Sequence, residues 1–349
     1  GGRRNIVING GMTVAQRGTS FTSTGSEFTI DRFRHEIGSS FNFDTTTTQS
    51  SDHPDGFKNS LKITPDSVVT PSGSENGAIR YQIEGQDVQH FAHGTSSAKP
   101  MTLSFYAKSA SQNSGHVYSI QIRKYDPSDS RKYVLKPFTV TDSWQRFSFT
   151  FIGDTATAIV DTTAQGMELA WQLSCGPDDL VSEASTWTSS TKFQGVSGQN
   201  NFMDNTNNHF YLTGVQLEIG SQATAFEHRS FGEENQLCKR YFQRYVNIVA
   251  VGYVPNNGSK SYSHGFVYPV EMRSSPTIAI TATGSSQGQA CTDGENTVYV
   301  TSLLSSGRKI GHLSMSFNLS GDLTDYRGAY LVSQGSTANR TEYTLTSEL

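Results

Sequence analysis

The sequence predicts an all-β protein made of two β-sandwich, jelly-roll-like domains joined by one short helix. Three observations predict it. Stretches with a bulky apolar residue at every second position recur along the 349 residues, and this is the period of a strand that buries one face. Gly, Asn, Ser and Thr separate these stretches, as in antiparallel sheets joined by turns. Only 17% of the residues are charged, whereas helix surfaces favour Glu, Lys and Ala.

The first domain is predicted from a series of alternating stretches. Residues 1–27 are expected to form a separate N-terminal segment of strand and loop, with the strand at 5–9. Residues 28–232 are expected to form the first sandwich. Its strands are predicted at 28–37, 57–63, 78–83, 101–107, 117–122, 133–140, 144–151, 167–173 and 209–217. Strands in this number without intervening helices fit a jelly roll.

One amphipathic segment interrupts the strands. Residues 233–246 are predicted to be a connecting helix, because Leu237, Tyr241 and Tyr245 recur at i, i+4 and i+8 and form an apolar stripe. The stripe leaves two interpretations open, an oligomer contact and packing against its own domain. Residues 247–349 are expected to form a second, smaller β-sandwich. Its strands are predicted at 247–254, 263–270, 277–283, 297–301, 309–319 and 342–345.

Charge and hydropathy argue against two classes of partner. The net charge is −4 and the 27 Lys and Arg residues form no basic block, so nucleic acid is not expected. No run of about 18 apolar residues occurs, so membrane insertion is not expected. Cys175, Cys238 and Cys291 are odd in number and far apart, which favours buried free thiols over disulfides or zinc. The chain begins at Gly1 without an initiator Met, so we expect a processed product, a fragment or a chain with a short engineered scar.

The sequence lacks local catalytic signatures. A nucleophile elbow G-x-S-x-G between strand and helix, an H-E-x-x-H pair and a phosphate-binding loop are all absent. The paired carboxylates of a glycosidase would come from distant strands, so sequence spacing says nothing about them. We therefore expect that the protein is not an enzyme.

Two groups of residues are candidate metal ligands. His90 and His93 are spaced i, i+3, but a metal site needs a third ligand and supporting contacts, so we expect a solvated, hydrogen-bonded turn there. Oxygen-only calcium sites tolerate irregular backbone, although acids after a strand are also ordinary turn residues. The candidate ligands for a structural calcium are Glu27, Asp178, Asp179 and Glu218. No other cofactor is expected.

Exposed aromatic side chains on a sandwich are candidates for stacking on sugar rings, as in sites that combine apolar surface with a few polar groups. Trp187 follows a strand in a Ser- and Thr-rich stretch and is the first candidate for glycan binding. Tyr253, Tyr262 and Tyr268, around the first hairpin of the second domain, are the next. The alternative is that each ring packs under its own loop, because large aromatic side chains are usually mostly buried.

Several runs of sequence resemble one family. They include NIVINGGMTVAQRG at 5–18, FYLTGVQLEIG at 210–220, and shorter runs at 29–33, 84–90, 103–108, 175–179, 223–229 and 238–242. Together they resemble tail-fibre and other virion structural proteins of tailed phages, especially marine ones. The resemblance covers residues 3–245. It implies a jelly roll related in shape to carbohydrate-binding modules, and no catalysis.

The resemblance also implies a place and partners. The protein is expected on the surface of the virion after assembly in the host cytoplasm, bound to other virion proteins, and as a homotrimer by analogy with phage fibres. The expected function is that of a tail fibre or receptor-binding part that contacts host-surface polysaccharide or another receptor. One alternative is a purely structural virion protein, such as a capsid decoration or tail collar component. A second is a glycan depolymerase.

Overall fold

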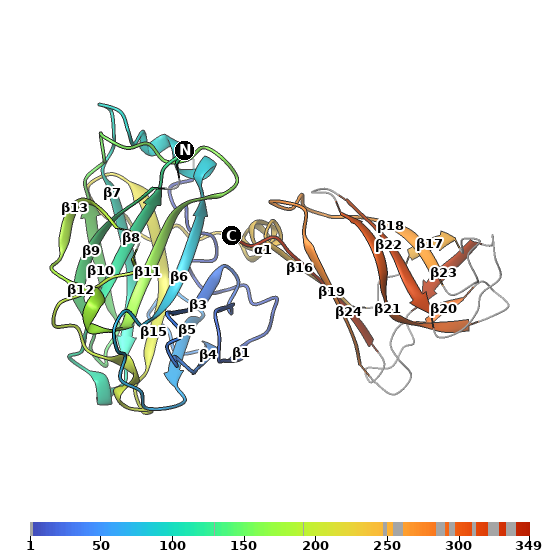
Figure 1. Cartoon of the computed structure of the whole chain (residues 1–349), viewed down its shortest axis with the longest axis horizontal. Coiled ribbons are helices and arrows are strands. Elements are labelled where there is room, and N and C mark those ends of the chain that lie inside the picture. The colour runs from blue at the N-terminus through green and yellow to red at the C-terminus, as the bar shows by residue number, and fades with distance from the viewer. Residues whose placement is uncertain are drawn as a thin grey trace. The chain divides into compact units, whose positions relative to one another are not determined.

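The computed structural model describes residues 3–128, 130–190, 192–246, 250–253, 261–283, 290–292, 297–308, 312–319, 328–332 and 340–349. The chain divides into two compact units. The first runs to Asn235 and the second covers Gln236–Glu348. Both are built mainly from antiparallel strands (Figure 1), so the all-β prediction is confirmed. No helix in the described ranges is long and apolar enough to cross a bilayer.

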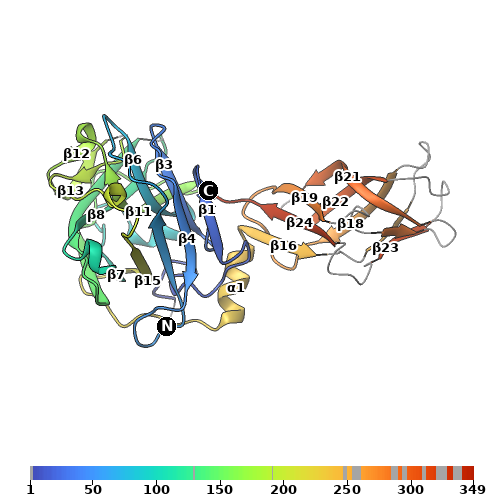
Figure 2. The same cartoon turned by 90° about the horizontal axis from the view of Figure 1, so that it is seen from below.

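The first unit is a sandwich of two sheets. The six-stranded sheet has the order β1-β4-β5-β15-β7-β10, and the seven-stranded sheet has the order β13-β9-β8-β11-β6-β3-β2. The chain crosses between the sheets from β5 to β6 and from β6 to β7, which is a jelly-roll-like connection. Figure 2 shows β6 and β7 from a second direction. The strands are β1 (Ser20–Ser23), β2 (Glu27–Phe28), β3 (Phe33–Gly38), β4 (Thr45–Ser50), β5 (Ser60–Pro65), β6 (Asn76–Glu84), β7 (Met101–Ser109), β8 (Val117–Tyr125), β9 (Arg131–Thr139), β10 (Gln145–Phe151), β11 (Gln165–Cys175), β12 (Leu180–Val181), β13 (Ala184–Ser189), β14 (Gly195–Val196) and β15 (Phe210–Ile219).

The core of this unit forms between the inner faces of the two sheets. Leu103 and Phe105 from β7 meet Leu169 and Trp171 from β11, and all four side chains are fully buried. The Phe105 and Trp171 rings lie with centroids 5.6 Å apart in an edge-to-face arrangement. Burying each large apolar side chain contributes about 1.5–3 kcal/mol. The alternation in the sequence therefore predicted the core-facing side of both strands correctly.

The second unit differs from the expected second sandwich. A three-stranded sheet contains β16 (Phe242–Val246), β24 (Arg340–Thr346) and β19 (Thr277–Thr283). The remaining strands close into a barrel: β17 (Ala250–Tyr253), β18 (Ser261–Val267), β22 (His312–Leu319), β21 (Thr297–Arg308), β20 (Ala290–Thr292) and β23 (Gly328–Val332). Closure depends on β23, which pairs with both β17 and β20. Strand spacing along the chain does not reveal such pairings.

The connecting helix is shorter than predicted. Helix α1 spans Phe231–Lys239, so the prediction of a helix to residue 246 is wrong in its second half. Phe242–Val246 is strand β16, which pairs with β24 and places Tyr245 opposite Tyr343. Aromatic residues favour strands when a partner strand is available. Here the partner lies far along the chain, and its pairing overrides the local helical period.

The N-terminal segment is also different from the prediction. Residues 5–9 form no strand, and the backbone N–H groups of Val7 and Val14 donate instead to the side chains of Asn5 (3.0 Å) and Asn9 (2.9 Å). Such side-chain bonds compete with sheet pairing. Val7 and Met12 are fully buried in the core of the first unit, so this segment belongs to the sandwich.

The thiols follow the prediction where they are described. Cys175 and Cys238 are buried and free. Burial raises the pKa of the Cys175 thiol to about 12, which makes it unreactive at neutral pH. The side chain of Cys291 lies outside the described residues.

Candidate functional site

A pocket of about 240 Å³ lies in the first unit, beside β7 and β15. Four segments line it: the N-terminal segment at Gly11 and Thr13, the loop between β4 and β5 at 56–58, the residues Phe226, His228 and Arg229, and helix α1 at Glu234. We call residues 220–229, which follow β15, the strap. The pocket is thus built from parts of the chain that are far apart in sequence.

Three aromatic rings form the apolar wall of the pocket. Phe57 lies with its ring centroid 5.0 Å from Phe226 and 5.3 Å from His228, and Phe226 and His228 are 4.8 Å apart at an interplanar angle of 76°. Phe57 and Phe226 are half-buried and His228 is exposed. The wall therefore keeps aromatic surface open to solvent, which is the kind of surface on which the apolar face of a sugar ring packs.

A glycine positions this aromatic wall. Gly214 in β15 has φ +61°, and the register of β15 against β7 shifts between Thr213 and Gln216, as at a β-bulge. A Cβ atom at Gly214 would lie 2.7 Å from Phe57 and 2.8 Å from Tyr106. The glycine therefore permits both the left-handed backbone and the contact of the Phe57 and Tyr106 rings, whose centroids are 5.3 Å apart.

The polar lining of the pocket comprises Thr13, Lys58 and the ion pair of Arg229 with Glu234. Lys58 is exposed at the rim. Glu234 accepts hydrogen bonds from Arg229 (3.1 Å) and from the backbone N–H of Asn9 (2.6 Å). Because its carboxylate is held in these contacts, Glu234 is poorly placed to act as a general acid or base. The arrangement suits binding of a hydroxyl-bearing or anionic ligand.

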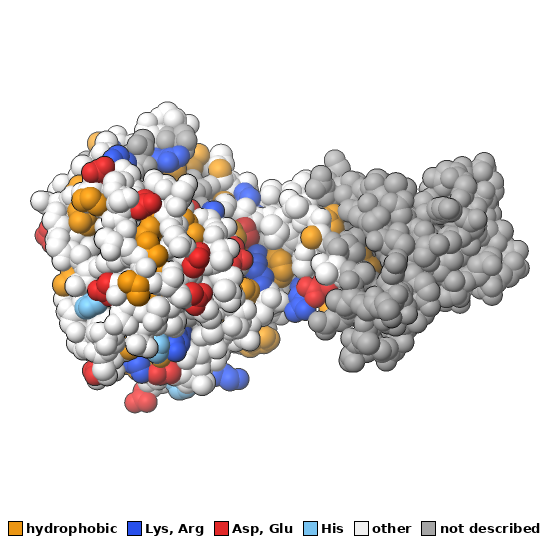
Figure 3. Space-filling view, turned by 60° about the horizontal axis from the view of Figure 1, so that its bottom comes forward, with side chains coloured by type: hydrophobic (Ala, Val, Ile, Leu, Met, Phe, Trp, Pro, Cys, Tyr) orange, Lys and Arg blue, Asp and Glu red, His pale blue; other side chains and the backbone are white. Residues whose placement is uncertain are grey.

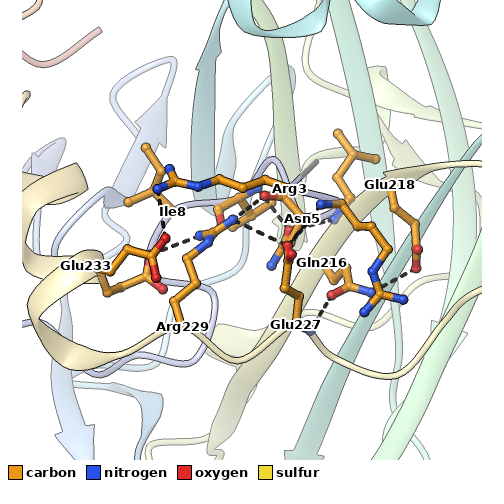
Figure 4. Close-up of polar contacts among 12 residues, drawn as sticks. Arg3, Asn5, Ile8, Gln216, Glu218, Glu227, Arg229 and Glu233 are labelled. Carbon is orange, nitrogen blue, oxygen red and sulfur yellow. Dashed lines mark hydrogen bonds and ion pairs between the residues drawn. The ribbon is translucent and has the colours of Figure 1, made fainter. Parts of the chain in front are cut away.

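Hydrogen bonds and ion pairs hold the N-terminal segment against the strap (Figure 4). The backbone N–H of Asn5 donates to Glu227 (2.7 Å), and the backbone N–H of Glu227 donates to Gln216 (2.8 Å). Burial alone would raise the pKa of Glu227, but hydrogen bonds from the Asn5 and Arg4 backbone lower it below its usual value. Arg229 donates to the carbonyl oxygens of Val7 (3.0 Å) and Asn5. The runs at 5–18, 210–220 and 223–229 thus meet in one network.

A second aromatic group lies nearby on the outer face of the six-stranded sheet. Asp52 accepts from Trp144 Nε1 (2.9 Å) and from Lys108 Nζ. Burial alone would raise the pKa of Asp52, but these two hydrogen bonds lower it. Lys108 and Lys62 place their ammonium groups 5.0 and 5.6 Å from the Tyr211 ring centre. The chain's own cations therefore occupy this aromatic surface, and the pocket remains the better candidate site.

Trp187, the first glycan candidate from the sequence, is partly covered. It lies in β13, is half-buried, and donates from Nε1 to the carbonyl oxygen of Ile152 (2.8 Å). The His93 ring is 5.4 Å away in an edge-to-face arrangement, and Lys124 Nζ lies 5.2 Å from the indole centre. Part of this ring is thus covered by residues from other segments of the chain, namely His93, Lys124 and Ile152.

The tyrosine candidates lie in the second unit. Tyr268 is 5% exposed, so the expectation of an open ring there is wrong. It follows β18 directly, and its ring is buried rather than presented by a hairpin. Tyr253 and Tyr262 belong to β17 and β18, but their side chains lie outside the described residues.

The four calcium candidates do not converge. Glu27 is exposed in β2, and Glu218 is buried in β15 of the other sheet, where it accepts from Gln216 (2.8 Å). Asp178 is exposed, whereas Asp179 is buried and bonded to Lys192 (2.7 Å). Across the described ranges, no three His, Cys, Asp or Glu side chains are grouped to hold a metal ion.

The predicted oligomer stripe is not formed. Leu237 is half-buried in α1, Tyr241 is 1% exposed after the helix, and Tyr245 lies in β16. The three side chains share no helix face because the helix ends at Lys239. The expected trimer therefore has no support from this stripe and remains a proposal.

His93 is buried, which corrects the expectation of a solvated turn. The segment 85–91 is the 3₁₀-helix η1 (Gly85–Phe91), and His93 follows it with 6% of its surface exposed. Burial, with a smaller contribution from Lys124, lowers the pKa of His93 to about 4. The imidazole is therefore neutral in the folded protein at pH values above that.

This histidine predicts an acid-sensitive stability. In the unfolded chain His93 becomes protonated as the pH falls below ~6.5. In the folded chain it stays neutral until about pH 4. The free energy of unfolding therefore decreases as the pH falls between these two values. The shift corresponds to a loss of about 3 kcal/mol at most. Urea unfolding between pH 7 and pH 4 is expected to show a steeper fall for the unchanged protein than for His93→Gln. Identical slopes would contradict this.

The pocket residues are absent from the candidates that the sequence suggested. Phe57 lies about 170 residues before Phe226 and His228 in the chain, so no local pattern joins it to them. The one usable signal was Phe226 and His228 at alternate positions in the run 223–229, which places both on one side of an extended segment.

On the described part of the face drawn in Figure 3, apolar, acidic and basic side chains are scattered rather than gathered in one large patch.

No protein-family model matches the chain, and no curated protein does.

Several solved structures are similar to part of the chain. One is the enzymatically active domain of tailspike protein 4 of bacteriophage CBA120, with 13% identity over 62% of this chain and 21% of that one, and a TM-score of 0.33. Another is the family 11 carbohydrate-binding module of the Clostridium thermocellum cellulase Lic26A-Cel5E, with 13% identity over 60% and 100%, TM-score 0.31. A third is the xylan-binding domain CBM22-1 of Paenibacillus barcinonensis Xyn10C, with 11% identity over 64% and 100%, TM-score 0.31. All three TM-scores lie below 0.5, so nothing about binding or activity follows from them.

Proposed function

We propose that the protein is a non-catalytic appendage protein of a tailed-phage virion, a tail fibre or receptor-binding part, and that its pocket contacts host-surface glycan. The observation that carries the glycan part is the wall of Phe57, Phe226 and His228. The virion part rests on the sequence resemblance over residues 3–245. Other virion proteins are the expected partners, and the expected assembly is a homotrimer.

The geometry supports one sugar unit at the pocket. Its volume of about 240 Å³ lies just below the range of about 300–1,000 Å³ for small-molecule sites, so it suits a single ring rather than a long chain. The aromatic rings offer a stacking surface, and Lys58 and the hydroxyl group of Thr13 offer polar contacts at the rim. Glu234 is engaged by Arg229, which supports binding without turnover.

Removing aromatic surface from the pocket is expected to weaken glycan binding. His228→Ala changes an exposed side chain and should leave the fold intact. Each lost stacking contact is expected to weaken binding by about tenfold. The experiment measures adsorption of the purified full chain to host cells and to a glycan array, for the unchanged protein, His228→Ala and Phe226→Ala.

A matched control is Phe231→Ala, because Phe231 is 63% exposed and lies outside the pocket. It should adsorb like the unchanged protein. Absence of any signal for the unchanged protein would favour the purely structural virion protein. Loss of host polysaccharide viscosity on incubation would instead establish a depolymerase and end the non-catalytic proposal.

A further inference from the structure

The outer face of the seven-stranded sheet carries a group of buried polar side chains. On β8, β11 and β6 these residues alternate with core residues such as Ile122, Leu169 and Tyr81, so they point away from the core. We call five of them the polar floor: Arg80, Gln121, Arg123, Glu168 and Gln172. All five are at most 5% exposed.

Two amides of the polar floor are unsatisfied. Gln121 and Gln172 are fully buried, and within the described part of the chain neither the Nε2 nor the Oε1 atom of either side chain has a hydrogen-bond partner. Native proteins rarely leave buried amides in this state, because each unmade hydrogen bond destabilises the fold. Such groups therefore call for hydrogen-bond partners from outside the chain, either a ligand or ordered water.

Two alanines with short side chains lie among the long side chains of the polar floor. Ala170 is fully buried and stands between Arg80 on β6 and Gln121 on β8 in the register of the sheet. Ala78, also fully buried, stands opposite Gln172. Small side chains surrounded by long ones form a depression, which another group must fill.

Phe193 is packed against this part of the sheet. Its ring centre lies 3.2 Å from the Arg80 guanidinium carbon and 3.7 Å from that of Arg123. A phenyl ring stacks well on guanidinium groups, but it has neither a donor nor an acceptor to offer the Gln121 and Gln172 amides on the same face of the sheet. The Phe193 ring thus stacks on the two guanidinium groups of the polar floor. It leaves the two glutamine amides without hydrogen-bond partners.

The charge of the floor favours a neutral ligand. Arg80 forms ion pairs with Glu36 (3.3 Å) and Glu168 (3.6 Å), and Glu168 also interacts electrostatically with Arg123, so the two carboxylates balance the two guanidinium groups. A sugar ring is about as large as a phenyl ring and carries hydroxyl groups that both donate and accept. Those are the partners that two glutamine amides require.

We propose that the polar floor is a second binding site, for one unit of a neutral glycan, and that the Phe193 ring occupies it in the unbound protein. Binding moves the ring aside and satisfies Gln121 and Gln172 with sugar hydroxyls. The ligand class rests on the proposed function, but the site is separate from the pocket, which lies beside the other sheet.

The test is calorimetric titration of the full chain with cellohexaose, xylohexaose, mannohexaose and maltohexaose. Phe193→Ala removes the competing ring, so affinity for at least one of these should rise about tenfold or more. Adding Gln121→Met and Gln172→Met should abolish that binding. The same pair should raise the melting temperature by about 2–4 °C or more, because two unsatisfied amides become apolar.

Gln145→Met is the matched control, since Gln145 is exposed on β10 of the other sheet. It should change neither quantity. A lower melting temperature for the paired methionine variant would mean that only buried water satisfies the amides, which overturns the proposal, as would no gain with Phe193→Ala. If His228→Ala loses host adsorption while Phe193→Ala gains nothing, this site fails and the pocket stands. The reverse pattern keeps this site and removes the pocket.

Discussion

Asp154→Asn is expected to lower the free energy of unfolding by about 3–5 kcal/mol, because it leaves a buried cation without its partner. The carboxylate of Asp154 lies 2.7 Å from Lys124 Nζ, and the two side chains are 8% and 1% exposed. Lys132 Nζ contacts the same carboxylate oxygen at 3.0 Å. Asparagine keeps the size of the side chain and removes the charge, so the loss reports the ion pair rather than a cavity.

The lowered pKa of Asp154 predicts how the stabilisation by this ion pair depends on pH. Burial alone would raise that pKa, but hydrogen bonds from Lys124, from the Ala156 backbone and from Lys132 lower it far below its usual value. A lowered pKa in the folded state means that the stabilisation is present at neutral pH. It is lost only as the pH falls below the usual carboxyl range.

The control for this variant is Glu183→Gln. Glu183 pairs with Lys136 at 3.3 Å but is 51% exposed, and exposed pairs contribute only about 0–1 kcal/mol. Urea denaturation at pH 7 measures both variants, with the midpoint shift at constant slope giving the change. Equal, small losses for the two would show that Lys124 finds water or another partner when the carboxylate is gone.

Arg229→Met should be similarly damaging, by about 3–5 kcal/mol, because it removes the partner of a buried carboxylate. Arg229 and Glu234 are 3.1 Å apart, with side chains 5% and 8% exposed. The same guanidinium donates to the carbonyl oxygens of Asn5 and Val7, so the variant also releases the N-terminal segment from the strap. Faster cleavage of that segment by a protease is therefore expected together with the loss of stability.

Arg3→Met is the comparison. Arg3 forms an ion pair with Glu233 at 2.8 Å in the same network (Figure 4), but the two side chains are 52% and 42% exposed. Its loss should change stability by less than about 1 kcal/mol. If Arg229→Met were as mild as Arg3→Met, the network of Figure 4 would not be what fixes the N-terminal segment.

The alternation of apolar residues predicted the strands of the first unit well. The prediction failed at residues 242–246, whose partner strand is distant in the sequence. Residues 101–107 and 167–173 lie in β7 and β11. Their apolar residues fall at every second position, which places them all on one face of a strand but not on one face of a helix. Tyr241 and Tyr245 continue the helical spacing from Leu237, yet residues 242–246 form β16 and pair with β24. The local sequence of this segment is compatible with a helix and with a strand, and pairing with β24 stabilises the strand.

The candidate sites show the same division. Trp187 was singled out for its composition, but the His93 and Lys124 side chains beside it come from other parts of the chain. The four acids suggested for calcium looked equivalent in the sequence, and the fold put Glu27 and Glu218 on different sheets.

The sequence by itself determined that the chain is all-β and which side chains of its main strands face the core, because a two-residue period has only one way to bury one face. Only the tertiary structure decided where aromatic surface stays open, at Phe57, Phe226 and His228, and where polar groups are left buried, at Gln121 and Gln172. The physical reason is that openness and hydrogen-bond satisfaction depend on neighbours supplied by distant segments, and local periodicity carries no record of them.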